Sequence, residues 1–164
     1  MPDYKAPLRD VKFVLEELLD CDAHYQKLGY HEASLDMIDA IMTEGAKFTE
    51  QVFAPLNQIG DQQGCVWSEG KVTTPDGFKE AYQQYIAGGW PTLSQSVQYG
   101  GQGLPHSLNV SFSEFLTGAN HSLAMYPGLS HGASATIEAH GTQAQKDTFL
   151  PKLVQGNWTG TMCV

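Results

Sequence analysis

The segment that most constrains the fold is the end of the chain, Thr142 to Val164, where a helical pattern gives way to an extended one. Thr142 followed by Gln145 is the signature of a capping box, which begins a helix, and Gly156 can end that helix. From Trp158 onward, aromatic and β-branched residues are typical of a strand. No turn signal follows Val164, so the pattern predicts a strand without a partner in this chain. We therefore expect the chain to be a fragment of a longer protein.

Ahead of that segment, apolar residues recur at helical spacing along most of the chain. The predicted helices cover residues 8–20, 34–56, 74–88, 108–119 and 123–140. Pro55 should kink or end the second helix, because its ring displaces the carbonyl four residues earlier. Thr74 is expected to cap the third helix, with Pro75 at its first position. Residues 60–71 and 89–105 are predicted to be loops, and the predicted fold class is all-α with one terminal strand.

Charge and hydropathy exclude several classes of partner. The chain of 164 residues has 18 acidic against 9 basic residues, a net charge of −9, and this negative field repels phosphate groups. No stretch is long enough for a membrane span, and no signal peptide precedes the first helix. Three cysteines without a spaced framework are typical of reduced thiols. We therefore expect a cytoplasmic protein that binds neither nucleic acid nor a membrane.

The chain carries no evident catalytic constellation of its own. His131 and His140 are nine residues apart and lie on roughly opposite faces of a helix, which disfavours a shared metal ion. Cys163 has no base nearby, and no Gly-x-Ser-x-Gly elbow occurs. We expect no metal site and no catalytic residue within these residues.

Three stretches resemble acyl-CoA dehydrogenases. Residues 150–164, Leu-Pro-Lys-Leu followed by Asn-Trp-Thr-Gly and then Met-Cys-Val, are similar to the end of the family's amino-terminal helical domain. Residues 89–105 resemble its Gly-Trp and Tyr-Gly-Gly-x-Gly segment. The leader, residues 1–15, resembles that of a bacterial subgroup that includes the 3-methylthiopropanoyl-CoA dehydrogenases. Because the three stretches follow the family's order, the chain is identified as a member.

The resemblance implies a domain organisation. Residues 1–30 would form a leader segment with a short helix, and residues 31–156 the amino-terminal helical domain of the acyl-CoA dehydrogenase fold. Residues 157–164 would begin the first strand of the middle β domain, which is truncated here.

The resemblance also implies an activity for the full-length protein. Family members use FAD to oxidise an acyl-CoA thioester to the 2,3-enoyl-CoA, and they pass electrons to an electron-transfer flavoprotein. A glutamate in the carboxy-terminal half removes the α-proton while flavin N5 accepts the β-hydride. That base lies outside this chain, so the fragment alone should be inactive. The full-length protein would be a homo-oligomer.

Few site residues carry over from the family. Met162 and Val164 match the strand that contacts the flavin, although a plain core strand is the alternative. Tyr126, Leu129 and His131 fall where the family's helix lines the acyl pocket, and ordinary helix packing would explain them equally well.

Two rival functions stay open from the sequence. An acyl-CoA oxidase shares the fold and passes its electrons to oxygen. A non-catalytic helical interaction module would need only the helical part of the chain.

Overall fold

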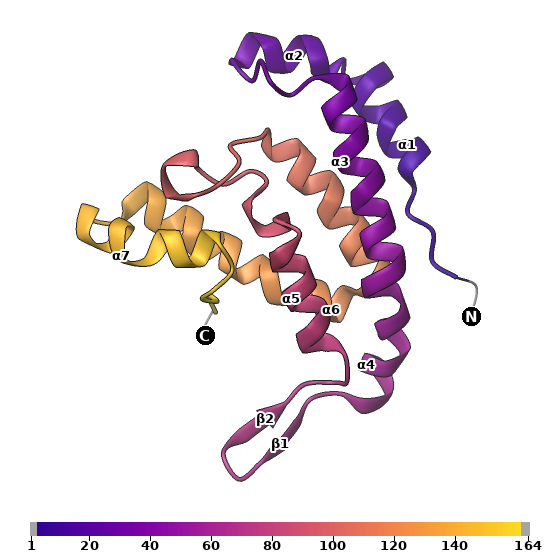
Figure 1. Cartoon of the computed structure of the whole chain (residues 1–164), viewed down its shortest axis with the longest axis vertical. Helices are drawn as coiled ribbons and strands as arrows, with labels where there is room; N and C mark the ends of the chain where they lie inside the picture. The colour runs from indigo at the N-terminus through magenta and orange to yellow at the C-terminus, as the bar shows by residue number, and fades with distance from the viewer. Residues whose placement is uncertain (1–2, 162–164) are drawn as a thin grey trace.

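The computed structural model describes residues 3–161 as a helical assembly from which one hairpin protrudes (Figure 1). The helices are α1 Leu8–Lys12, α2 Cys21–Leu28, α3 Leu35–Phe48, α4 Asn57–Gln63, α5 Phe78–Ala87, α6 His106–His140 and α7 Gln143–Val154. The strands are β1 Val66–Ser68 and β2 Lys71–Thr73, and π-helical segments cover Phe13–Leu18 and Thr49–Phe53. Short 3-10 turns lie at Ala54–Leu56, Trp90–Thr92 and Val97–Tyr99. The predicted all-α class is confirmed.

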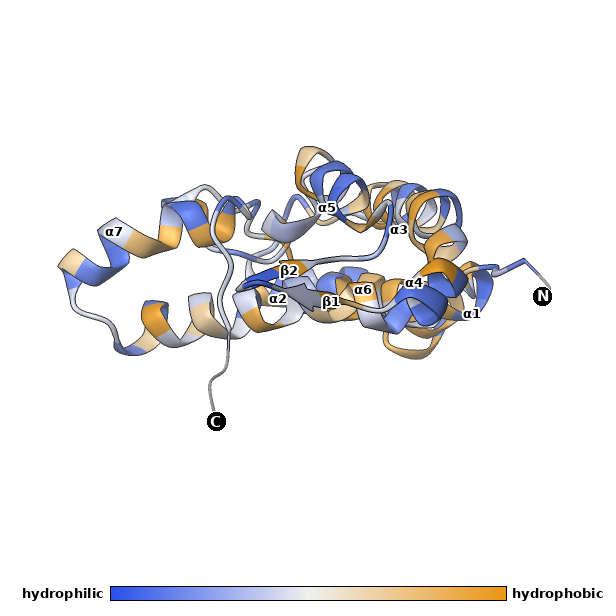
Figure 2. Ribbon diagram, turned by 90° about the horizontal axis from the view of Figure 1, so that it is seen from below, coloured by the Kyte–Doolittle hydropathy of each residue, from blue (hydrophilic) through white to orange (hydrophobic). Residues whose placement is uncertain are grey.

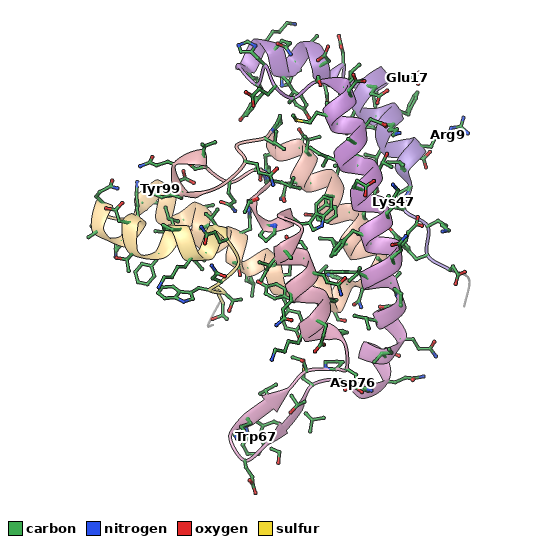
Figure 3. All side chains as sticks on the ribbon, viewed as in Figure 1. Arg9, Glu17, Lys47, Trp67, Asp76 and Tyr99 are labelled. Carbon is green, nitrogen blue, oxygen red and sulfur yellow. The ribbon has the colours of Figure 1, made fainter. Side chains whose placement is uncertain are left out.

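The loop predicted over residues 60–71 is wrong. Helix α4 continues to Gln63, and β1 and β2 then pair antiparallel, with Trp67 opposite Val72. Glu69 and Gly70 turn the chain with φ of 48° and 80°, and positive φ at both positions matches the twist of a hairpin. The hairpin escaped prediction because its strands are only three residues long and Glu-Gly is a weak turn signal. Trp67 stands out from the body of the molecule (Figure 3).

Of the two predicted capping signals, one is correct and one is wrong. Thr142 forms the predicted capping box with Gln145. Ser34, at the start of the helix predicted over residues 34–56, caps α3 by accepting from the Met37 N–H. Thr74 does not cap α5, which begins at Phe78 after Gly77. The Phe78 N–H instead closes a turn onto the carbonyl of Pro75 at 3.2 Å, so the preceding residues belong to a turn rather than to the helix.

The helix from Ser34 does not end at Pro55. It passes through the π-helical and 3-10 segments and resumes as α4, so the proline distorts the helix without stopping it. The Thr49 hydroxyl, which is fully buried, donates to the carbonyl of Ala46 at 2.9 Å where the π-helical segment begins. Of the two predicted effects of Pro55, an end to the helix is therefore wrong, and the structure shows a local change of helix type instead.

Helix α6 bends sharply at Asn120, whose φ of −161° and ψ of 90° are not helical. The bend divides α6 into a first arm, residues 106–119, and a second arm, residues 121–140 (Figure 1). These arms correspond to the two helices predicted over residues 108–119 and 123–140. Helix α7 folds back along the second arm, and apolar residues recur along both (Figure 2).

Two clusters of apolar side chains hold these elements together. The main core joins the leader, α3, α5 and the first arm, and its largest fully buried members are Phe53, Phe112, Phe115, Ile38 and Met42. A smaller cluster of Tyr99, Leu150 and Val154, with Ile137 against it, fastens α7 to the second arm. The second arm therefore has one face on the core and α7, while another face stays uncovered.

The segment after α7 crosses back over the second arm. The Trp158 N–H donates to the carbonyl of Lys152 at 3.0 Å, and the Gly160 N–H donates to Ser130 Oγ at 3.1 Å. The strand expected from Trp158 onward is not formed within residues 157–161, since no neighbouring strand is there to pair with it. Residues 162–164 lie outside the described part. Among residues 3–161, no helix has both the length and the apolar character that a bilayer crossing needs.

Candidate functional site

An apolar groove of about 490 Å³ lies between α5, the second arm of α6 and the terminal segment. Its lining residues are Thr74, Phe78, Lys79, Tyr82, Met125, Tyr126, Leu129, Thr159, Gly160 and Thr161. We call it the α5–α6 groove. None of these lining side chains is a carboxylate, and Lys79 is the one cation among them. The groove is therefore suited to an apolar ligand and supplies no acidic catalytic group of its own.

Helical spacing brings the side chains of the second arm to the groove. Met125 and Leu129 are four residues apart and share one face, and both are substantially exposed. Gly128 and Gly132 add no bulk to this arm, and a Cβ at either position would meet nothing within 4 Å. Neither glycine is among the residues that line the groove, so the open space beside them lies elsewhere on the second arm.

The terminal segment lies tightly against the second arm. A Cβ at Gly160 would lie 2.6 Å from the Cβ of Ala133 and 3.2 Å from the carbonyl of Leu129. Only a glycine allows this approach, and the bond from its N–H to Ser130 Oγ fixes the register. The segment thus forms one edge of the groove.

Tyr126 lines the groove close to the start of the hairpin. Its hydroxyl lies 3.6 Å from Cys65 Sγ, and its ring meets Phe78 edge to face with centroids 6.2 Å apart. Burial is the main cause that raises the pKa of Tyr126 to about 12, and the hydrogen bond with Cys65 contributes to the same rise. Tyr126 is therefore a neutral hydroxyl at physiological pH, able to donate a hydrogen bond but not to act as a base.

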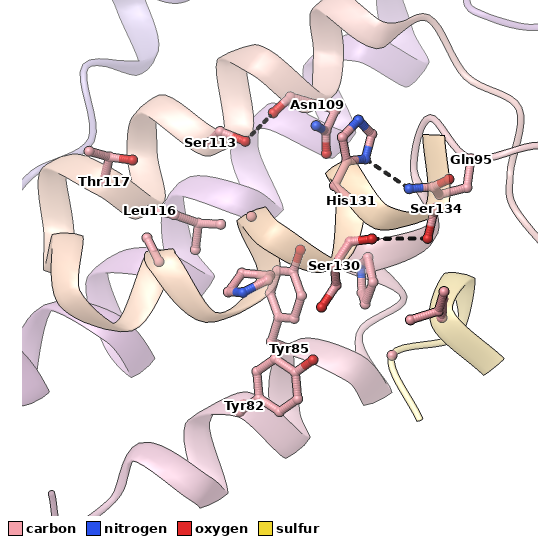
Figure 4. A pocket seen from close by; sticks show the side chains of 16 residues that line it. Tyr82, Tyr85, Gln95, Asn109, Ser113, Leu116, Thr117, Ser130, His131 and Ser134 are labelled. Carbon is pink, nitrogen blue, oxygen red and sulfur yellow. Dashed lines mark hydrogen bonds between the residues drawn. The ribbon is translucent and has the colours of Figure 1, made fainter. Parts of the chain in front are cut away.

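His131 does not line the groove. It borders a separate cavity of about 150 Å³ among α5, α7 and both arms of α6 (Figure 4). Gln95 Nε2 lies 2.8 Å from His131 Nδ1, and the rings of His131 and His106 stack with centroids 5.4 Å apart. Burial lowers the pKa of His131, and nearby His106 lowers it further. Both observations agree with a neutral His131 ring whose Nδ1 accepts a hydrogen bond from the side-chain amide of Gln95.

The structure thus brings together two of the five residues singled out from the sequence. Tyr126 and Leu129 share the groove, whereas His131 faces the other cavity. Met162 and Val164 lie outside the described residues. Thr161, which precedes them, lines the groove.

Sequence reasoning missed the α5 side of the groove. Phe78 and Tyr82 lie in the helix predicted over residues 74–88. A predicted helix does not show which of its side chains border a groove. The pairing of Phe78 with Tyr126 joins residues far apart in the chain, so no local pattern could have found it. Within residues 3–161, no three His, Cys, Asp or Glu side chains come together as a metal site.

Comparison with known proteins adds evidence on the whole chain. The model of the acyl-CoA dehydrogenase N-terminal domain matches residues 36–157. The 3-methylmercaptopropionyl-CoA dehydrogenase of Ruegeria pomeroyi is 36% identical over 159 residues, which cover 97% of this chain and 27% of the relative. A butyryl-CoA dehydrogenase of Syntrophomonas wolfei is 33% identical over 170 residues, covering 98% of this chain and 27% of the relative.

A more distant relative gives the same result. The mitochondrial isovaleryl-CoA dehydrogenase of Bos taurus is 31% identical over 124 residues, which cover 73% of this chain and 26% of the relative. The chain therefore spans about a quarter of the length of the curated relatives it matches.

Proposed function

The chain belongs to the acyl-CoA dehydrogenase family, and from this premise we propose that it is the amino-terminal helical part of an FAD-dependent enzyme that oxidises an acyl-CoA to the 2,3-enoyl-CoA. The leader would comprise residues 1–30, the helical domain residues 31–156, and the start of the middle β domain residues 157–164. By itself this part would be inactive, because the catalytic glutamate expected from the family lies outside it. Acyl-CoA, an electron-transfer flavoprotein and further copies of the same subunit would be the partners of the full-length enzyme.

The observation that carries this proposal is the apolar α5–α6 groove. An acyl chain is apolar and narrow. Its binding free energy is most favourable where it displaces water from apolar surfaces such as those of Phe78, Met125 and Leu129. In this proposal Leu129 and Tyr126 contact the acyl chain, whereas His131, on the far cavity, supports the helix and does not touch substrate.

In this proposal a flavin would lie at the terminal edge of the groove. FAD, when bound, supplies the hydride acceptor of the reaction. Thr161 lines the groove, which supports Met162 and Val164 as flavin contacts beside the acyl site. The role of these residues is to orient the two reactants and to exclude water from between them. The α-proton is removed by a group that this chain does not contribute.

The test is to express the longer protein that contains this chain and to purify it. We expect a yellow protein whose flavin absorbance bleaches when an acyl-CoA is added without oxygen. Leu129→Ala should raise KM for the acyl-CoA, because it removes apolar contact in the groove. Leu28→Ala, an exposed leucine outside the groove, is the matched control and should leave KM unchanged. A protein that binds no flavin, or that no acyl-CoA bleaches, would refute the proposal.

A further inference from the structure

The hairpin of β1 and β2 carries apolar side chains that the rest of residues 3–161 leaves exposed. Trp67 is 72% exposed, and Val72, directly opposite it, is 65% exposed. Side chains directly opposite each other in an antiparallel pair project from the same face, so these two form one small apolar surface. We call it the Trp67–Val72 face. Tryptophan is one of the side chains that most often anchor protein interfaces.

The hairpin has little to stabilise it besides its own pairing. Its strands have three residues each, and every residue of both strands is exposed. In the described part of the chain the sheet has only these two strands, so each strand keeps one edge without a neighbouring strand. A two-stranded hairpin by itself is at best marginally stable in water, and a third strand or a packed layer adds to its stability.

The base of the hairpin is nevertheless held in place. Gln63, before β1, and Asp76, after β2, are joined twice: Gln63 Nε2 donates to Asp76 Oδ2 at 3.0 Å, and the Asp76 N–H donates to Gln63 Oε1 at 2.8 Å. Cys65 Sγ lies 3.6 Å from the hydroxyl of Tyr126, which links the start of β1 to the second arm. The hairpin therefore projects from the body at a set position (Figure 1, Figure 3).

The hairpin and the terminal segment border the same groove. Thr74, the residue after β2, lines the α5–α6 groove, and so does Thr161, the last described residue of the terminal segment. The chain spans about a quarter of the length of the curated relatives it matches. In the longer protein of the proposed function, the polypeptide reaches the groove at Thr161 and continues from there. Its next part is therefore tethered on the side of the molecule that carries the hairpin.

The size of the Trp67–Val72 face favours a tethered occupant over a separate molecule. A stable complex of two separate proteins buries about 800 Å² on each partner, whereas one tryptophan side chain buries about 150–250 Å². One face of this hairpin falls well short of the larger area, because its two strands have three residues each. A tethered partner needs less area, since a short linker holds it at an effective concentration in the millimolar range. The rest of the same polypeptide is such a partner.

We propose that the hairpin is a docking arm for the rest of its own polypeptide, and that the part of the longer protein beyond residue 164 packs on the Trp67–Val72 face. This inference rests on the proposed function only in taking the chain as one part of a longer protein, and it needs neither flavin nor acyl-CoA. An apolar, strand-forming segment fits best, because it can bury Trp67 and also pair with a free strand edge.

Docking at the hairpin has a consequence for the groove. The chain passes from β2 through Thr74 to Phe78 at the start of α5, and both residues line the α5–α6 groove. A hairpin held by the rest of the polypeptide therefore fixes the α5 wall of the groove relative to the part of the protein that follows.

Hydrogen exchange in this chain and in the longer protein tests the docking. In the longer protein, the amides of residues 66–73 should exchange at least about tenfold more slowly than in this chain alone. Trp67→Ser should remove that protection in the longer protein. In this chain alone the same variant should leave the unfolding equilibrium constant in urea unchanged, because Trp67 is exposed. Equal exchange rates in the two proteins would overturn the proposal.

The matched control is Val97→Ser. Val97 is 70% exposed and lies outside both the hairpin and the lining of the α5–α6 groove. Exchange of residues 66–73 in the longer protein should be the same with and without this change. Loss of protection in Val97→Ser as large as in Trp67→Ser would mean that the Trp67–Val72 face is not the docking surface.

A photo-crosslinking side chain at position 67 identifies the occupant. In the longer protein, a benzophenone-bearing amino acid in place of Trp67 should form crosslinks within one polypeptide to residues beyond 164. A product of doubled mass on a denaturing gel would place a second copy on the face and overturn the proposal. Crosslinks confined to residues 3–161 would also overturn it.

The docking arm and the proposed function fail separately. A yellow protein whose flavin bleaches with an acyl-CoA, but whose hairpin exchanges as fast as in this chain alone, would overturn the docking arm and leave the enzymatic activity standing. A colourless protein with a protected hairpin, crosslinked to residues beyond 164, would refute the activity and support the docking arm.

Discussion

Asn120 and Leu123 fix the point at which α6 changes direction. The side-chain Oδ1 of Asn120 accepts a hydrogen bond from the backbone N–H of Leu123 at 3.1 Å, which is the geometry of an N-cap for the second arm. The same side chain donates from Nδ2 to the carbonyl of Phe53 at 3.2 Å and is only 1% exposed. One residue therefore begins a helix and also fastens the bend to the distorted segment before Pro55.

Replacing Asn120 with leucine should strongly destabilise the chain. Asn120→Leu removes the cap and also the side-chain donor to the carbonyl of Phe53. Together these losses should lower the free energy of unfolding in urea by about 2–4 kcal/mol. Ser34→Ala removes only the cap of α3 at an exposed position and should cost about 1 kcal/mol. Equal effects for the two variants would mean that the buried bond to Phe53 contributes nothing.

The stability of the fold should depend on pH through His131. Because burial and His106 hold its pKa below the ordinary 6.5, the unfolded chain binds a proton more readily than the folded chain. The stabilising contribution is therefore fully present above about pH 6.5 and is lost as pH falls from there through the lowered pKa of the folded state. Urea denaturation between pH 5 and 7.5 should show stability rising with pH.

The matched variants for this prediction lie on the same helix. His131→Gln removes the titrating ring and should flatten the dependence of unfolding free energy on pH. His121→Gln replaces an exposed histidine of the second arm and should leave the slope as it is in the unchanged chain. If both variants keep the full slope, another group controls the pH dependence.

Much of the fold could be predicted because its signals are local. Thr142 and Gly156 each act within a few residues of the chain, and the structure uses both to begin or end a helix. The prediction from Thr74 was wrong because a cap signal next to a proline is compatible with either a turn or a helix. The helix begins later, at the buried Phe78. The hairpin was missed because a two-residue turn with positive φ at both positions favours Asn-Gly or Asp-Gly, and this chain has Glu69 and Gly70 there.

The candidate site could be predicted only in part because it is made by tertiary contacts. Spacing puts Tyr126 and Leu129 on neighbouring positions of one helix, but only the bend at Asn120 turns that helix towards α5. His131, two residues beyond Leu129, turns to the other side and meets Gln95 from a distant loop. The family resemblance indicates which helix to examine. The structure then shows which face of that helix borders the groove.

The leader should depend on Glu50 for its attachment. The carboxylate of Glu50 accepts from Lys5 Nζ at 2.8 Å and from the backbone N–H of Ala6 at 3.0 Å. The bond from Lys5 is the main cause that holds the pKa of Glu50 below its ordinary 4.5, and the N–H of Ala6 adds to it. Glu50→Ala should speed hydrogen exchange at Ala6 roughly tenfold, with a small effect on global stability.

The control for the leader is Glu44→Ala. This variant removes an exposed ion pair between Glu44 and Lys47 on α3, and neither residue pairs with the leader. Exchange at Ala6 should be unchanged in that variant. Because the lowered pKa of Glu50 means that the folded chain favours the carboxylate, the attachment should also weaken as pH falls below 4.5. If neither Glu50→Ala nor acid pH changes the hydrogen-exchange rate at Ala6, then Glu50 does not hold the leader. The hydrogen bond from Tyr4 to the carbonyl of Phe115 would then be the contact that does.

Gly128 and Gly132 should lower the stability of the second arm without contributing to the α5–α6 groove. A methyl group at either position meets nothing within 4 Å, and alanine is the better helix former. Each of Gly128→Ala and Gly132→Ala should therefore raise the free energy of unfolding of this chain by about 0.5–1 kcal/mol. Gly160→Ala is the opposite control, because its methyl would lie 2.6 Å from the Cβ of Ala133, and it should destabilise.

In the longer protein the same two alanines should leave the acyl site unaffected, because neither glycine is among the residues that line the α5–α6 groove. KM for the preferred acyl-CoA should therefore be the same in Gly128→Ala and Gly132→Ala as in the unchanged protein. A raised KM in either variant would contradict the placement of the acyl chain against Phe78, Met125 and Leu129.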